Sequence, residues 1–218
     1  MSEESSFVST VAAIPLRDAT LVLPAELLTD VFKYLTTIYP KYKPKSTQTL
    51  SYRRHHTRLS WLVVSHVNQR WRYIVLDTPS LWSRLYVDME KSWDAFLECS
   101  KPALLSIEGP CSTSHIILRI PSLIEHRHRI RELDLQRITP YHLGNLVAGL
   151  TDSLLNIEVM SIECEPFGDE PVLELPADFF SVTMPNLRKL KLIDVEFPWG
   201  TGSMSLTNFE YRAIPSHY

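Results

Sequence analysis

Histidine is the residue type in this chain best suited to metal chemistry, and it occurs in two clusters. His55 and His56 lie in a run of basic residues, whose charge repels cations. His126 and His128 alternate with arginines and have few acidic neighbours. A basic environment of this kind disfavours a bound cation such as zinc. We therefore expect no metal, and interpret these histidines as surface groups or as a pH-sensitive contact.

Carboxylates could support acid–base chemistry, which requires a pair of them in a cleft. One acidic cluster is present, formed by Glu163, Glu165, Asp169, Glu170 and Glu174. We interpret it as a solvated face between strands, with a patch for a basic partner as the alternative. No serine lies in a G-x-S-x-G motif. No cysteine is paired with a histidine in a recognisable nucleophile pattern, so we do not expect an enzyme.

Loops that hold phosphates or dinucleotides are not expected either. The chain has 6 glycines against 15 prolines and contains no G-x-G-x-x-G or G-x-x-x-x-G-K-[ST] motif, so we expect no cofactor. Cys99, Cys111 and Cys164 are odd in number and widely spaced, which favours reduced, buried thiols. There is no secretory signal and no apolar run of about 18 residues, as a membrane span would need. We expect an intracellular protein with no membrane partner, in the cytoplasm or the nucleus.

The helices that could build a binding surface lie between Leu23 and Trp82. Pro24 suits the first position of a helix. Apolar residues then recur at helical spacing, at Leu27, Leu28, Val31, Phe32 and Leu35. This pattern predicts a short amphipathic helix that ends before Pro40. A helix of this length is marginal alone, so its wide apolar stripe must pack on something.

A second helical stretch is predicted from about residue 59 to 76, with a break near His66. The segment Asp77-Thr78-Pro79 ends it. The turn after it should tuck Trp82 underneath the helices, and Leu85-Tyr86-Val87-Asp88 then indicates a short strand. Residues 93–100 predict one more helix, with its aromatic residues facing inward.

A basic block separates the two helical stretches. Between Asp30 and Asp77 there is no acidic residue and there are nine basic ones, although the whole chain has a net charge of −3. Residues 36–58 hold much of this charge, and we interpret them as a solvated insertion. A contact with an acidic partner or a nucleic acid is the alternative.

The C-terminal region contains a weak repeat of the form apolar-x-x-apolar-x-apolar. Its middle positions are Leu105, Leu133, Met160, Leu190 and Phe209, which lie 28, 27, 30 and 19 residues apart. This is the spacing of leucine-rich repeats, in which a short strand is followed by a helical or irregular return. We expect returns beginning at Pro121 and Pro176, and another over residues 143–150. The alternative is an ordinary small α/β domain with parallel strands.

The N-terminal motifs resemble an F-box. The residues that carry the resemblance are Leu23-Pro24-x-Glu26-Leu27-Leu28-x-x-Val31-Phe32-x-Tyr34-Leu35, then Val64-Ser65-x-Val67-x-x-Arg70-Trp71-Arg72-x-Ile74, then Leu81-Trp82. The closing segment Thr78-Pro79-Ser80-Leu81-Trp82 is similar to F-box proteins of mushroom-forming fungi, and residues 184–192 are similar to the repeats of fungal F-box proteins. The chain departs from the family in its long basic insertion at 36–58.

The resemblance implies a three-helix module that binds the Skp-type adaptor, and through it the cullin, of an SCF ubiquitin ligase. It places on the adaptor Leu23, Pro24, Leu27, Leu28, Val31, Phe32 and Leu35, with Val64, Val67 and Trp71 divided between the module core and the interface. A target protein of unknown identity would bind the repeat strands, at Glu132, Asp134, Ser161, Glu163, Lys189 and Lys191. The rival interpretation is a non-catalytic scaffold or nucleic-acid-associated protein that uses the basic loop and does not engage the adaptor.

The expected fold is therefore mixed, α+β or α/β. Residues 1–20 form a disordered lead-in, and residues 21–88 form the F-box with its insertion. Residues 89–218 form a short leucine-rich-repeat-like solenoid with parallel strands. Because no polar capping helix follows Tyr211, we also expect either a truncated product or an end that another chain covers.

Overall fold

The computed structural model describes residues 22–38, 59–89, 91–111, 113–150, 154–165, 173–175, 179–197 and 207–212. The expected lead-in at 1–20 and nearly all of the basic insertion lie outside these residues. The described chain begins with four helical elements: α1 (Ala25–Ile38), the 3-10 helix η2 (Ser60–His66), α3 (Gln69–Leu76) and α4 (Pro79–Trp82). Together they form the N-terminal helical unit.

The predicted break in the second helical stretch is confirmed. The chain leaves η2 at Val67, and Asn68 adopts an extended conformation (φ −158°, ψ 173°) that no helix contains. Its side-chain oxygen accepts a hydrogen bond from the backbone N–H of Trp71 at 2.8 Å, which satisfies one of the free donors at the start of α3. Asn68 at the break is thus the N-cap of α3, the helix that contains Trp71.

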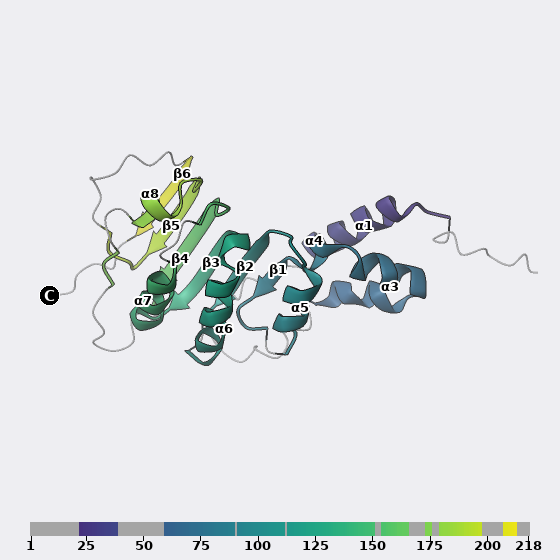
Figure 1. Cartoon of the computed structure of the whole chain (residues 1–218), viewed down its shortest axis with the longest axis horizontal. Coiled ribbons are helices and arrows are strands. Elements are labelled where there is room, and N and C mark those ends of the chain that lie inside the picture. Colours follow the sequence, from purple (N-terminus) through teal and green to yellow (C-terminus); the bar gives the residue numbers. More distant parts are fainter. Residues whose placement is uncertain are drawn as a thin grey trace, which may run out of the picture.

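A six-stranded parallel sheet follows, and its strands lie side by side in the order in which the chain makes them (Figure 1). The strands are β1 (Arg84–Tyr86), β2 (Leu105–Pro110), β3 (Ile130–Ile138), β4 (Val159–Cys164), β5 (Lys189–Ile193) and β6 (Asn208–Arg212). All five strands predicted from the repeat are present. The strand predicted at 85–88 begins one residue earlier and ends two residues earlier, at Tyr86.

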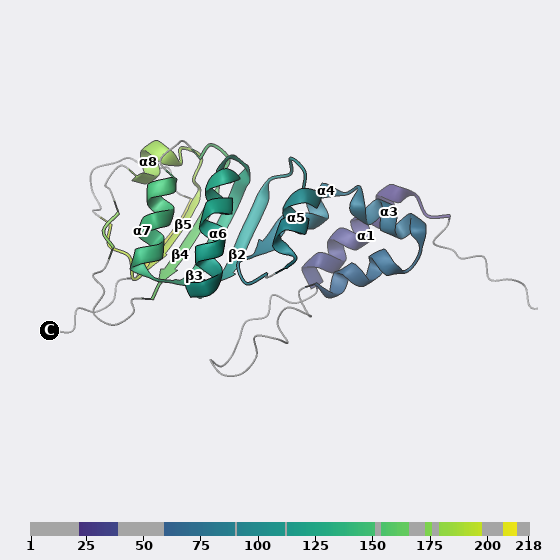
Figure 2. The same ribbon diagram turned by 60° about the horizontal axis from the view of Figure 1, so that its bottom comes forward.

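The connections between strands contain helices that lie on one face of the sheet. They are α5 (Trp93–Cys99), α6 (Thr113–Glu125) with the 3-10 turn η3 (Arg127–Arg129), α7 (Pro140–Gly149) and α8 (Phe179–Thr183). Figures 1 and 2 both show α6 and α7 on the same side of the strands, with the N-terminal helical unit at the β1 end. Strand residues alternate between buried and partly exposed in β2 and β4, so the opposite face is open.

One of the predicted returns is wrong in position. Pro121 does not begin a helix but lies inside α6, which starts eight residues earlier. Ile116 and Leu123 are about two turns apart on this helix and are almost completely buried. Their burial offsets the backbone hydrogen bond that proline cannot donate. The return at 143–150 is confirmed as α7, and Pro176 lies outside the described residues.

A single hydrophobic core runs through the described residues from α1 to Phe197, just after β5, and β6 contributes no buried residue to it. At its N-terminal end, three aromatic rings meet edge to face. The centroid of Trp61 lies 5.4 Å from that of Trp82 and 6.3 Å from that of Phe96, and the last two are 5.0 Å apart. The N-terminal helical unit therefore shares its core with the sheet rather than packing as a separate globule.

Candidate protein-docking surfaces

The wide apolar stripe of α1 is divided by the structure into two. Leu28 and Phe32, which are one turn apart, are 2% and 0% exposed and face the core. Leu27 and Val31, each one residue earlier, are 52% and 50% exposed. Successive helical residues are about 100° apart, so the first pair forms an inner stripe and the second pair begins an outer stripe that the chain leaves uncovered.

The residues predicted to bind an adaptor therefore fall into three groups. Leu23, Pro24, Leu27, Val31 and Val67 are exposed. Leu35 and Trp71 are half-buried against the core. Leu28, Phe32 and Val64 are buried inside the chain and present no surface to a partner as the molecule stands.

The contacts of Trp71 explain which stripe is covered. Its ring lies 5.1 Å from that of Phe32, at an interplanar angle of 57°. One residue before it, the guanidinium of Arg70 donates a hydrogen bond to the carbonyl oxygen of Leu23. This bond holds the start of α3 beside the start of α1, so Val67 lies at the same end of the helical unit as Leu23.

Sequence reasoning missed several exposed apolar residues of the helical unit. Tyr34 and Ile38 continue the outer stripe at seven and eleven residues after Leu27, and they are 65% and 50% exposed. Val63 on η2 and Tyr73 on α3 are also exposed. Tyr34 and Ile38 could have been found from the sequence. With Leu27 and Val31 they recur every three or four residues, which places all four on one face of a helix.

A second surface is the open face of the sheet. The parallel register aligns Glu132 with Val159 and Lys189 in one row, and Asp134 with Ser161 and Lys191 in the next. Aligned residues of parallel strands point to the same face, and Glu163 belongs to that face two residues after Ser161. All six residues predicted to bind a target thus lie on one face, opposite the helices.

Charge changes along this open face. Its acidic residues are Glu108 on β2, Glu132 and Asp134 on β3, Glu163 on β4 and Glu210 on β6, whereas its basic residues are Arg84 on β1 and the lysines of β5. Ion pairs join neighbouring strands at both ends: Arg84 Nε lies 4.0 Å from Glu108, and Lys191 Nζ lies 3.5 Å from Glu210. These pairs are partly exposed and contribute little to stability, so the charged groups remain accessible to a partner.

The arginine-rich segment around His126 and His128 has a structural role. Arg129 donates hydrogen bonds to the carbonyl oxygen of Ala103 and, at 2.6 Å, to the hydroxyl of Ser100. Arg127 donates to the carbonyl oxygen of Ile124 at 2.8 Å. Burial is the main factor lowering the pKa of His126. Across the part of the chain that the structure describes, no three His, Cys, Asp or Glu side chains are placed to hold a metal ion.

The cysteines differ in their surroundings. Cys111 and Cys164 are buried, and Cys99 is partly exposed. Burial, helped by the negative charge of Asp134, raises the pKa of the Cys111 thiol to about 12. A thiol with so high a pKa stays protonated at neutral pH, and only the thiolate is nucleophilic. None of the described helices is both long and apolar enough to span a membrane.

Comparison with known proteins gives one match. Residues 20–88 match the family described as F-box-like. The matched range begins just before α1, contains the whole N-terminal helical unit and ends two residues after β1. Searches of curated proteins and of solved structures found nothing that matches the chain. The match supports an F-box protein, and it rests on the part of the molecule that presents the outer stripe.

Proposed function

We propose that this chain is the substrate-receptor subunit of an SCF-type cullin–RING ubiquitin ligase, of the kind found in mushroom-forming fungi. The N-terminal helical unit would bind the Skp-type adaptor, and the open face of the sheet would bind a target protein. The chain would catalyse no reaction itself. It would raise the concentration of the target beside the ligase.

The observation that carries the proposal is the exposed outer stripe inside the range that matches the F-box-like family. Exposed apolar side chains gathered on one part of a surface usually mark a protein interface. Leu27, Val31 and Tyr34 are all at least half exposed, although their neighbours on the inner stripe are buried. The proposed adaptor-binding set is therefore the exposed part of the predicted one, Leu23, Pro24, Leu27, Val31 and Val67, extended by Tyr34.

The proposed target-binding region is the leucine-rich-repeat-like solenoid over residues 89–218. Its support is the sequential order of the parallel strands, together with helical returns on one face. Each repeat contacts only its neighbours in such an architecture, which leaves a continuous strand surface free. Glu132, Asp134, Ser161, Glu163, Lys189 and Lys191 are the residues we propose for target contacts.

The test is co-purification of the full chain with the Skp-type adaptor. The double variant Leu27→Asp with Val31→Asp places two charges on the outer stripe without touching the inner one. Burying two unpaired charges at an interface should weaken binding at least hundredfold, or about 2.7 kcal/mol or more. Leu28 is unsuitable for this test, because a charge at a position that is 2% exposed would unfold the module itself.

A matched control is Leu118→Asp, which introduces the same charge on α6 at a position that is 67% exposed. It should bind the adaptor like the wild type. Wild-type chain that is folded by circular dichroism yet does not co-purify would contradict the ligase function. Equal binding by wild type and the double variant would contradict the outer stripe as the docking surface.

The basic block supports one rival, a scaffold or nucleic-acid-associated protein. Nine basic residues without an acidic one between Asp30 and Asp77 would favour an acidic partner. The test is retention of the full chain on single-stranded and double-stranded nucleic acid at rising salt. Strong, salt-dependent retention that disappears on neutralising Lys41, Lys43, Lys45, Arg53 and Arg54 would favour this rival.

A further inference from the structure

A pocket lies where the N-terminal helical unit meets the open face of the sheet, and we call it the seam pocket. It has a volume of about 110 Å³, far above the roughly 10–15 Å³ that one water molecule needs. Its apolar wall is formed by Trp61, Leu81, Phe96 and Leu104, and its polar wall by Thr36, Ser80, Ser83, Arg84, Tyr86, Ser106 and Arg131.

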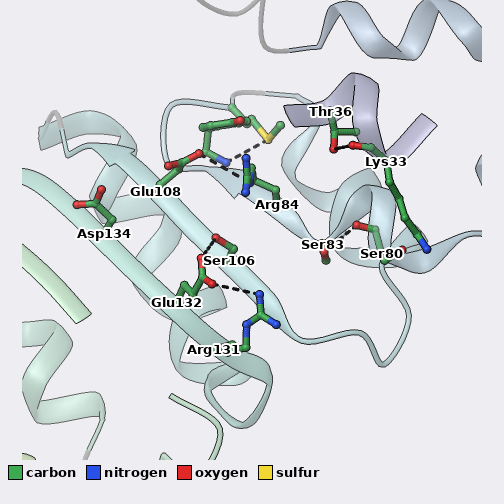
Figure 3. A network of polar contacts seen from close by, with 12 residues as sticks. Lys33, Thr36, Ser80, Ser83, Arg84, Ser106, Glu108, Arg131, Glu132 and Asp134 are labelled. Carbon is green, nitrogen blue, oxygen red and sulfur yellow. Dashed lines mark hydrogen bonds and ion pairs between the residues drawn. The ribbon is translucent and has the colours of Figure 1, made fainter. Parts of the chain in front are cut away.

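The charged residues that line the seam pocket all have the same sign. Arg84 comes from β1 and Arg131 from β3, while no Asp or Glu is among the described lining residues. Hydroxyl groups complete the polar wall. Figure 3 shows Arg84 and Arg131 on either side of Ser106, with Ser83 across from them. The hydroxyls of Thr36, Ser83 and Ser106 already donate their one hydrogen to Lys33, Ser80 and Glu132. The donors that remain for a ligand with acceptor oxygens are therefore mainly those of the two guanidinium groups.

Two glutamates outside the seam pocket lie beside the arginines and offset part of their charge. Glu132 accepts a hydrogen bond from Arg131 at 3.1 Å and one from the Ser106 hydroxyl at 2.9 Å. Glu108 lies 4.0 Å from Nε of Arg84, which is longer than a hydrogen bond. A guanidinium has five N–H donors, so both arginines keep donors for a ligand.

Arg84 is partly buried, whereas Arg131 is exposed. The side chain of Arg84 is 34% exposed, and that of Arg131 is 46% exposed. The apolar wall excludes water from one side of the seam pocket, because Trp61, Leu81 and Phe96 are buried. A charge-assisted hydrogen bond is stronger in such partly dry surroundings than in bulk water.

We propose that the seam pocket binds an oxyanion, a carboxylate or a phosphate, carried by a side chain of the target polypeptide. This proposal rests on the proposed function, since it places an anchor for the target at the β1 end of the open face. The target would lie along the sheet from this anchor, and its anionic side chain would enter between Arg84 and Arg131. Recognition would then depend on an acidic or a phosphorylated residue.

The test uses the full chain and two small probes, N-acetyl-phosphoserine amide and N-acetyl-glutamate amide, at constant ionic strength because exposed charges are screened by salt. Binding is followed by NMR of the arginine side-chain Nε–H groups. We expect saturable shifts at Arg84 and Arg131. Arg131→Gln should weaken binding about tenfold or more, and so should Arg84→Gln. The matched control Arg212→Gln, on β6 at the other end of the sheet, should have no effect.

A second measurement tests whether a negative charge beside Arg84 opposes binding of the probes. Glu108→Gln removes a negative charge near Arg84 and keeps the shape of the side chain, so it should strengthen binding of either probe a few-fold. Tighter binding of the phosphoserine probe would assign the anchor to a phosphorylated residue. Tighter binding of the glutamate probe would assign it to an acidic one, and both results support the oxyanion site.

Shifts that do not saturate, or binding that Arg131→Gln leaves unchanged in folded protein, would overturn the proposal. Arg131 is nearly half exposed, so this variant should fold even if Arg84→Gln does not. Adaptor co-purification is measured in parallel. Arg131→Gln should leave it unchanged, so loss of the oxyanion site and failure of the ligase function give different results.

Discussion

Trp82 and Phe96 pack edge to face, with ring centroids 5.0 Å apart and an interplanar angle of 74°. Trp82 closes the N-terminal helical unit, and its indole N–H donates a hydrogen bond to the carbonyl oxygen of Val75 at 2.8 Å. Phe96 belongs to α5, beyond the range that matches the F-box-like family. The contact therefore joins the N-terminal helical unit to the sheet through one core. Under the proposed function, a target on the sheet would be held at a fixed position relative to the adaptor.

Phe96→Ala should destabilise both parts of the molecule together. Removing a buried phenyl ring from a core costs about 3–5 kcal/mol, and Phe96 is 2% exposed. We expect urea unfolding, followed by tryptophan fluorescence and by circular dichroism, to give one coincident transition at lower urea. Tyr73→Ala, at a 70% exposed aromatic position, should change the free energy of unfolding by about 0.5 kcal/mol or less. Two separate transitions in the wild type would show that module and sheet unfold independently.

Asparagine side chains connect successive repeats in a way that the sequence pattern did not reveal. Asn156 donates a hydrogen bond to the carbonyl oxygen of His128 at 2.6 Å, and Asn186 donates one to that of Leu155, also at 2.6 Å. Each asparagine lies in the turn before a strand, and its acceptor lies in the turn before the preceding strand. Arg129 makes the corresponding contact with Ala103 one repeat earlier.

Asn156→Ala and Asn186→Ala should each lower the free energy of unfolding by about 0.5–1.5 kcal/mol, because each removes one hydrogen bond between repeats. The double variant should depart from the sum, because the acceptor of the second bond, Leu155, directly precedes Asn156 in the chain. Chemical denaturation of the full chain gives the measurement. Asn145→Ala on an exposed position of α7 is the control and should be neutral, and single variants as stable as this control would show that the bonds add nothing.

Cys111 predicts a loss of stability at alkaline pH. Its folded pKa of about 12 is raised above the ordinary value of 9.0, so the folded chain keeps a proton that the unfolded chain releases. The stabilisation is complete below pH 9 and is lost as the pH rises toward 12, by about 1.4 kcal/mol per pH unit. Urea unfolding at about pH 8 and about pH 10 should show a larger decline for the wild type than for Cys111→Ala. Parallel declines would contradict this burial effect.

The repeating strands could be predicted from the sequence because their signal is local. Alternation of apolar and polar residues within five or six positions is enough to form a strand with one buried face. The spacing of Leu105, Leu133, Met160 and Leu190 then gives parallel strands separated by returns. The same alternation predicted that Glu132, Ser161 and Lys189 lie away from the core, as the structure shows.

The start of α6 was predicted at the wrong residue, and the reason is physical. Proline is unfavourable inside a helix, so Pro121 indicated a start. The burial of Ile116 and Leu123 against the sheet outweighs this local preference, and α6 continues through the proline. The sequence contains the preference, but the compensating contacts exist only once the strands are assembled.

The sequence by itself determined that α1 carries a wide apolar stripe and that Trp82 closes the helical unit. Only the tertiary structure decided which half of that stripe is free. Leu27 and Leu28 are equally apolar neighbours, and the choice between them depends on the helices packed against α1. Among these is α3, whose Trp71 contacts Phe32 from more than 30 residues away in the chain. Likewise Arg84 and Arg131 meet at one pocket only because parallel strands bring distant segments together. Local periodicity sets what a helix or strand can bury, and long-range packing determines what it leaves exposed.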